Sequence, residues 1–151
     1  WEEYINILLS SHFYHPKNKN KFGAQQLFSD GNGLIYPDFI SKSTDPRLIV
    51  DAKYKPIENI RGRDYLQVLA YMYRFDASQG YYIYPDSEGQ VPLVLNLNKG
   101  STYENNVSTR DDVNIIKLGF KIPNKSANYD DFKMQIHESE LVLQNFINSQ
   151  I

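Results

Sequence analysis

The chain has 151 residues, which is enough for one domain with one sizeable hydrophobic core. Hydrophobic residues make up 41% and charged residues 23%, a globular composition that excludes an intrinsically disordered chain. The absence of cysteine excludes a disulfide framework and a thiolate metal site. No apolar run approaches the roughly 18 residues that a membrane-spanning helix needs. Because the first residue is Trp1, we expect the C-terminal part of a longer protein.

The net charge of −2 does not by itself suggest nucleic acid, but the charge is unevenly distributed. Residues 1–75 hold ten Lys/Arg and eight Asp/Glu, whereas residues 76–151 hold six and ten. If carboxylates of the first half bind a metal, the rest of its surface is basic and suited to phosphates. The candidate phosphate contacts are Lys17, Lys19, Lys21, Lys55, Arg61 and Arg63. Each of these side chains also suits an ordinary solvated loop.

Hydrophobic periodicity and turn residues predict the elements of the chain. Three helices are expected, over 1–12, 61–75 and 130–148, the second with a capping box from Asp64 to Gln67. Strands are expected over 24–29, 34–41, 47–54, 80–85, 91–97 and 113–122, with 98–112 as a mobile polar loop. In the last helix the expected apolar anchors are Phe132, Ile136, Leu141, Leu143 and Phe146.

This order predicts an α/β fold, with a mixed sheet flanked by helices. The helix over 61–75 joins the third strand to the 80–85 strand and therefore acts as a crossover between parallel strands. We see no repeat and no linker, so we expect residues 1–151 to form a single domain.

Two carboxylates and a lysine lie in stretches that otherwise resemble buried strands, within YPDFISKSTDPRLIVDAKYKP. A hairpin centred between Thr44 and Asp45 places Asp38 opposite Asp51, on the same face of the sheet. Because side chains alternate, Lys53 shares that face. Opposed like charges are destabilising, and a divalent cation such as Mg²⁺ removes the conflict. The sequence therefore predicts a metal site beside a lysine.

A solvated hairpin with an Asp–Lys ion pair is the simpler alternative. The flanking LIY and LIV are too apolar for a solvated edge.

Positions on the two predicted helices add further candidates. Glu2 lies at the border of the first helix's apolar face, whereas Glu3 lies on the far side. Gln67 and Tyr71 share a face of the second helix. A zinc site at His12 and His15 is not expected, because a third ligand is missing nearby.

The segments WEEYI, YPDFI, LIVDAKYKP, DYLQVLAYMY and GYYIYP, in this order, resemble the PD-(D/E)XK nuclease superfamily. They are most similar to the McrC family, the cleavage subunits of McrBC modified-cytosine restriction systems. The matching segments lie within residues 1–85, and residues 86–151 carry no motif of the family.

The resemblance implies an αβββαβ nuclease core and a Mg²⁺-dependent endonuclease, with Mn²⁺ able to substitute. It implies metal ligation by Asp38, Asp51 and the Ala52 backbone carbonyl, with Glu2 assisting through water. Lys53 then matches the catalytic lysine, and Gln67 and Tyr71 match the pair that orients the DNA backbone.

The resemblance also implies double-stranded DNA as substrate and a McrB-like GTPase as partner, engaged through a segment outside this chain. It further implies two nuclease sites in the working complex and a bacterial or archaeal cytoplasmic location. Two alternatives stay open: a RecB-like exonuclease or repair nuclease, and a module of the same fold that binds nucleic acid without cleaving it.

Overall fold

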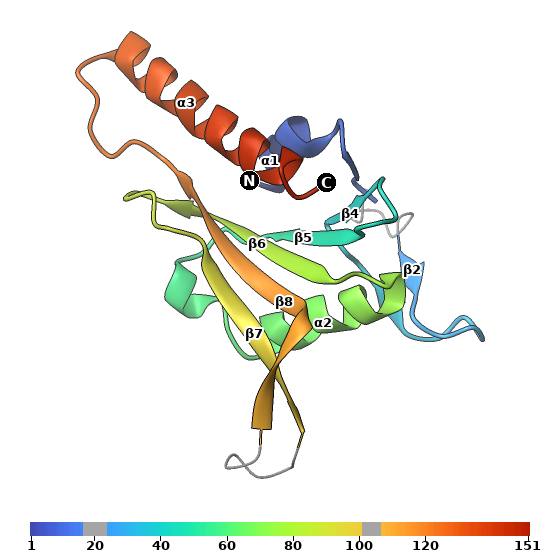
Figure 1. The fold of residues 1–151 in the computed structure, drawn as a ribbon. Coiled ribbons are helices and arrows are strands. Elements are labelled where there is room, and N and C mark those ends of the chain that lie inside the picture. The colour runs from blue at the N-terminus through green and yellow to red at the C-terminus, as the bar shows by residue number, and fades with distance from the viewer. Residues whose placement is uncertain (17–23, 101–106) are drawn as a thin grey trace.

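The computed structural model describes residues 1–16, 24–100 and 107–151, which form three layers: helices, a mixed sheet and a further helix (Figure 1). In chain order the elements are α1 (Glu2–Leu9), β1 (Phe13–Tyr14), β2 (Gln25–Gln26), β3 (Leu34–Ile35), β4 (Phe39–Ser41), β5 (Leu48–Ala52), the 3₁₀ helix η2 (Ile57–Asn59), α2 (Arg63–Phe75), β6 (Gln79–Asp86), β7 (Leu93–Gly100), β8 (Val107–Lys121) and α3 (Tyr129–Asn148). Among these described helices, none is long and apolar enough to cross a membrane.

The main sheet has six strands in the order β1-β4-β5-β6-β8-β7, and β2 with β3 forms a separate two-stranded ribbon. Neighbours β5, β6 and β8 are parallel, whereas β4 with β5 and β7 with β8 are antiparallel. The expected mixed sheet is therefore confirmed, and α2 forms the expected crossover between β5 and β6. Residues 86–151 complete this sheet through β7 and β8.

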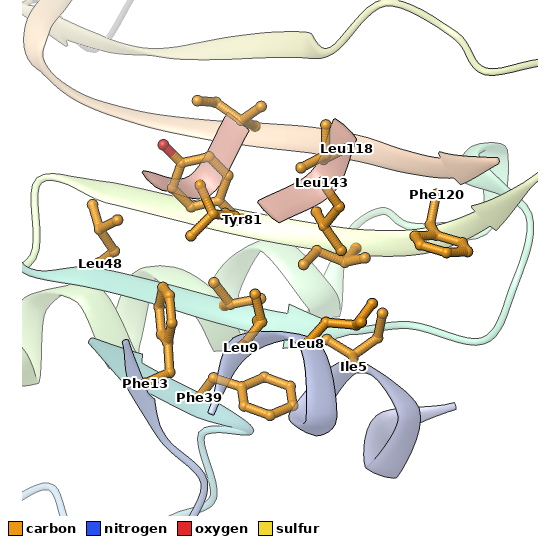
Figure 2. Close-up of a cluster of buried hydrophobic side chains, with 14 residues drawn as sticks. Ile5, Leu8, Leu9, Phe13, Phe39, Leu48, Tyr81, Leu118, Phe120 and Leu143 are labelled. Carbon is orange, nitrogen blue, oxygen red and sulfur yellow. The ribbon is translucent and has the colours of Figure 1, made fainter. Parts of the chain in front are cut away.

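Each face of the sheet has its own core, as the alternation of strand side chains requires. On one face, α1 and α3 cover a cluster that includes Ile5, Val50 and Leu143 (Figure 2). On the other face, α2 covers a cluster that includes Ile49 and Val68. Asp51 follows Val50, so its side chain points toward α2 and not toward α1.

Gly80 in β6 allows α2 to lie close to the sheet. A Cβ at this position would come within 2.6 Å of Val68 Cγ1 and of Met72 Sδ, both on the inner face of α2. Real Cβ atoms essentially never approach other heavy atoms that closely. The missing side chain therefore sets the distance between the sheet and the helix that carries Gln67 and Tyr71.

Several expected boundaries were wrong. The expected strand over 34–41 is split into β3 and β4 by a break at residues 36–38, where Pro37 cannot donate to a ladder. The polar residues 98–100 and 107–112 lie in β7 and β8 and not in a loop, while the intervening 101–106 lie outside the described residues. Pairing between the two strands outweighs the polarity of their side chains.

Two expectations about helices also need correction. Helix α2 has Gly62 as its N-cap without a side-chain cap hydrogen bond, so Asp64 and Gln67 form no capping box. In α3, Leu143 is buried and Ile136 and Phe146 pack against the core, but Phe132 and Leu141 are exposed. The other buried residue of α3 is Ile147, one turn beyond Leu143. Both lie in the C-terminal half of the helix, close to α1 (Figure 1).

Candidate active site

The predicted pairing of β4 with β5 is confirmed. Phe39 pairs with Val50 and Ile40 with Ile49, and the same register places Asp38 opposite Asp51. Asp38 lies in the break between β3 and β4, and its Oδ2 accepts a hydrogen bond of 2.9 Å from the backbone N–H of Ala52. The break thus turns the first carboxylate onto the end of β5, beside the second.

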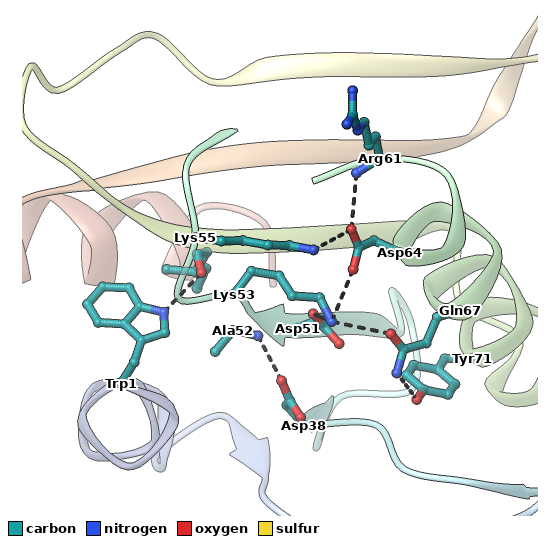
Figure 3. A network of polar contacts seen from close by, with 11 residues as sticks. Trp1, Asp38, Asp51, Ala52, Lys53, Lys55, Arg61, Asp64, Gln67 and Tyr71 are labelled. Carbon is teal, nitrogen blue, oxygen red and sulfur yellow. Dashed lines mark hydrogen bonds and ion pairs between the residues drawn. The ribbon is translucent and has the colours of Figure 1, made fainter. Parts of the chain in front are cut away.

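Asp51 and Lys53 form a close ion pair at the end of β5 (Figure 3). Lys53 Nζ lies 2.7 Å from Asp51 Oδ2, and Asp51 is only 1% exposed. The contact at Asp51 Oδ2 is an ion pair whose geometry does not meet the criteria of a hydrogen bond, so the charge of Lys53 is what compensates this carboxylate. Carboxylate oxygens are also the ligands that a hard divalent cation prefers, so such an ion would share Asp51 with Lys53.

The helix α2 contributes an amide and a phenol to the same place. Gln67 Oε1 accepts a hydrogen bond of 3.2 Å from Lys53 Nζ, and Gln67 Nε2 donates one of 2.7 Å to the Tyr71 hydroxyl. The shared helix face of these two residues is confirmed, and it faces Lys53. Tyr71 also packs in the core, with its ring buried.

Asp64, at the start of α2, adds a third carboxylate near Lys53. Its Oδ1 lies 3.6 Å from Lys53 Nζ. Its Oδ2 accepts hydrogen bonds from Lys55 Nζ at 2.6 Å and from the backbone N–H of Arg61 at 3.0 Å. Two cationic side chains, Lys53 and Lys55, therefore approach this half-buried carboxylate (Figure 3).

Burial raises the pKa of both aspartates of the pair. For Asp38 the largest cause is desolvation, followed by the negative charge of Asp51, and Glu2 contributes further. For Asp51 desolvation again dominates and outweighs the opposing effect of Lys53. Without a cation, the site resists carrying both negative charges, as expected for opposed carboxylates.

The pKa values of Lys53 and Asp64 shift in the directions that stabilise their charged forms. Burial lowers the pKa of Lys53, but the charges of Asp51 and Asp64 more than offset this, and the net shift is upward. Burial raises the pKa of Asp64, but the hydrogen bonds from Lys55 and Arg61 lower it overall. Lys53 is therefore a protonated ammonium near neutral pH.

Glu2 and Glu3 differ as predicted in exposure, but Glu2 reaches the site through His15. Glu3 is exposed and Glu2 is half-buried. Glu2 Oε1 lies 3.5 Å from His15 Nε2, and His15 Nδ1 donates to the backbone carbonyl of Asp38 at 2.9 Å. The His15 side chain, 7% exposed, stacks on Phe39. His15 thus connects α1 to the Asp38 segment.

The donors fit a hard, oxygen-ligated cation, although the protein supplies few of them. Within residues 1–16, 24–100 and 107–151, no group of three or more His, Cys, Asp or Glu is arranged to hold a metal ion. Asp38 and Asp51 provide two carboxylates. Mg²⁺ commonly binds one or two carboxylates and keeps several waters, so this pair is compatible with it.

The basic residues predicted to contact phosphates have different environments. Lys55 pairs with Asp64, while Arg61 and Arg63 are exposed near the start of α2. The Arg61 guanidinium points away from Lys53 (Figure 3). Lys17, Lys19 and Lys21 lie outside the described residues.

Among the described residues, Asp64 and His15 are neighbours of the site that the sequence prediction did not assign to it. A signal for Asp64 was present, because positions 64, 67 and 71 share one helix face. For His15 the sequence signal was weak, because its position depends on the preceding strand. That strand, β1, has only two residues and depends on pairing with β4.

Fold and site together define an α/β protein whose mixed sheet carries two opposed aspartates, one buried and one half-buried, and a lysine, facing a Gln–Tyr pair on a helix. The family model described as McrBC 5-methylcytosine restriction system component matches residues 1–85, which include all of these groups. The chain belongs to this family and is thereby a component of a modified-cytosine restriction system. A search of curated proteins found no match.

Proposed function

We propose that this chain is the nuclease of its restriction system, a metal-dependent endonuclease with a PD-(D/E)XK core in a single domain of residues 1–151. The observation that carries the proposal is the pair of half-buried Asp38 and buried Asp51, with Lys53 beside it. Bringing two carboxylates together away from water is costly, and their raised pKa values have no evident structural benefit. Perturbed carboxylates next to a lysine are typical of catalytic sites.

Asp38 and Asp51 would hold Mg²⁺ or Mn²⁺, together with the Ala52 carbonyl and, through water, Glu2. When bound, such an ion activates water and neutralises charge on the phosphate. Within the chain, Lys53 Nζ would donate to a non-bridging phosphate oxygen as negative charge grows there. Gln67 and Tyr71 would hold Lys53 and orient the DNA backbone.

The substrate we propose is double-stranded DNA, with Lys55, Arg61 and Arg63 contacting phosphates near the site. Cutting both strands needs two sites, so we expect two copies of the chain in the working complex. We further propose that a GTPase partner selects the modified DNA and engages this protein through a segment outside residues 1–151.

The test compares plasmid cleavage by the wild type, Asp38→Asn and Asp51→Asn, each with the GTPase partner, GTP and Mg²⁺. Each asparagine preserves shape but weakens metal binding, so both variants should lose cleavage while retaining the fold. Asp111→Asn is the matched control, because Asp111 is an exposed aspartate on β8. Cleavage by either site variant at the wild-type rate would contradict the assignment.

The same assay separates the alternatives. Cleavage of linear DNA but not of closed circular DNA would indicate an exonuclease. DNA binding without any cleavage by the wild type would indicate a binding module of the same fold.

A further inference from the structure

Three acceptors surround the ammonium of Lys53. They are Asp51 Oδ2 at 2.7 Å, Gln67 Oε1 at 3.2 Å and Asp64 Oδ1 at 3.6 Å. Gln67 Oε1 accepts a hydrogen bond from this ammonium, and the two carboxylates attract it by their charge. Two of them are carboxylates from different elements, Asp51 from β5 and Asp64 from α2.

Asp64 is held in place independently of Lys53. Its Oδ2 accepts from Lys55 and from the backbone of Arg61, and its side chain is 14% exposed. These bonds occupy one carboxylate oxygen and leave Oδ1 facing Lys53. The 3.6 Å separation is longer than a hydrogen bond, so Lys53 is closer to Asp51 than to Asp64 in this state.

The proposed function gives Asp51 two competing cations. A divalent ion and the Lys53 ammonium both require its carboxylate, and each positive charge disfavours the other there. Lys53 must therefore weaken its contact with Asp51 when the ion binds. If Asp51 were the only carboxylate near Lys53, the lysine would then move toward solvent, away from the position where it can reach a phosphate.

We propose that Asp64 is a positioning residue, which takes over Lys53 when a divalent cation binds Asp51 and so keeps the lysine in the site. This inference rests on the proposed function. Lys53 needs to move by only a short distance, since Asp64 Oδ1 is already beside it and Gln67 remains a common partner. The alternative is that Asp64 serves only to fix Lys55 and the loop before α2.

The two roles differ in how Asp64 affects metal affinity. If Asp64 receives Lys53, removing its charge makes Lys53 depend on Asp51 alone and increases the competition with the ion. This effect must vanish when Lys53 itself is replaced. If Asp64 only fixes the loop, its effect on metal affinity is the same with and without Lys53.

A double-mutant cycle on the 151-residue chain measures this coupling without DNA or cleavage. Mn²⁺ affinity is determined by calorimetry for the wild type, Asp64→Asn, Lys53→Met and the double variant. We expect Asp64→Asn to raise the Mn²⁺ dissociation constant about five- to tenfold in the wild type, but less than about twofold in the Lys53→Met background. Glu58→Gln, an exposed carboxylate variant in η2, controls for the general loss of negative charge.

Equal effects of Asp64→Asn in both backgrounds would overturn the proposal and leave the nuclease assignment standing. A wild type that binds no Mn²⁺ at millimolar concentration would overturn both. Thermal melting verifies that each variant folds. If Asp64→Asn fails to fold, the cycle is repeated with Asp64→Ser, whose hydroxyl can still accept from the Arg61 N–H but is too short to hold Lys53.

Discussion

Lys53 is the residue whose neighbours separate metal binding from catalysis most clearly. Its ammonium contacts Asp51 and Gln67, and its side chain is 19% exposed. Lys53→Met removes the charge and keeps the stem. We expect cleavage to fall by about 10²–10³, the scale of losing one transition-state stabiliser.

Metal and DNA binding by Lys53→Met should behave differently from cleavage. Mn²⁺ affinity should persist or rise, because a positive charge next to Asp51 is gone, and DNA affinity should fall little, because one phosphate contact among several is lost. Cleavage assays, metal titration and DNA binding on the same preparation measure all three. Metal binding that collapses together with cleavage would show that Lys53 is a structural partner of the aspartates.

Glu2 and Glu3 provide a matched pair of substitutions on one helix turn. Glu2→Gln weakens the contact with His15 and removes a negative charge near Asp38, so we expect slower cleavage and a higher Mg²⁺ requirement. Glu3→Gln alters an exposed position and should leave both unchanged. Mg²⁺ titrations of cleavage compare the two, and similar losses in both variants would place the functional face of α1 elsewhere.

Among the elements, α2 has the least tolerance for displacement, because it carries Asp64, Gln67 and Tyr71 together. Gly80→Ala would place a methyl group against Val68 and Met72 and push α2 away from β6. We expect a loss of about 1–3 kcal/mol in unfolding free energy, as for other overpacked cores. Chemical denaturation measures it, and Val68→Ala in the same chain should restore part of the loss if the clash is the cause.

The predicted elements were most accurate where a local rule applies. Turn position and strand alternation were sufficient to oppose Asp38 and Asp51, and helix spacing placed Gln67 and Tyr71 together. The predicted capping role of Asp64 was wrong because the capping rule considers only residues at the start of one helix. The partners of Asp64 are Lys55 and Arg61, and their positions depend on how the loop after β5 folds back. The contact of His15 with Asp38 likewise depends on long-range pairing of β1.

At the scale of the whole molecule, the aspartate pair should make the stability of the metal-free protein depend on pH. Burial and Asp51 raise the pKa of Asp38 from 3.8 to about 7. A raised carboxyl pKa favours folding while the group is protonated, and this contribution is lost as the pH rises from about 4 to about 7.

The matched comparison is Asp38→Asn, which cannot ionise and retains an oxygen for the Ala52 N–H. In EDTA, we expect the wild type to lose stability relative to this variant between about pH 4 and pH 7, and the difference to level off above that. Denaturation curves at several pH values measure the difference. A difference that stays constant with pH would mean that Asp38 ionises at its ordinary pKa.

The place of β6 in the sheet has a consequence for how the protein can be divided. The family match ends at residue 85, inside β6, whose residues Gln79–Asp86 pair along their length with Asn114–Lys121 of β8. A fragment cut near this boundary would keep every proposed catalytic group but would leave β6 as a long, apolar edge strand, a template for aggregation. We expect such a fragment to precipitate on expression, and we therefore expect the folding unit to extend beyond the residues that match the family.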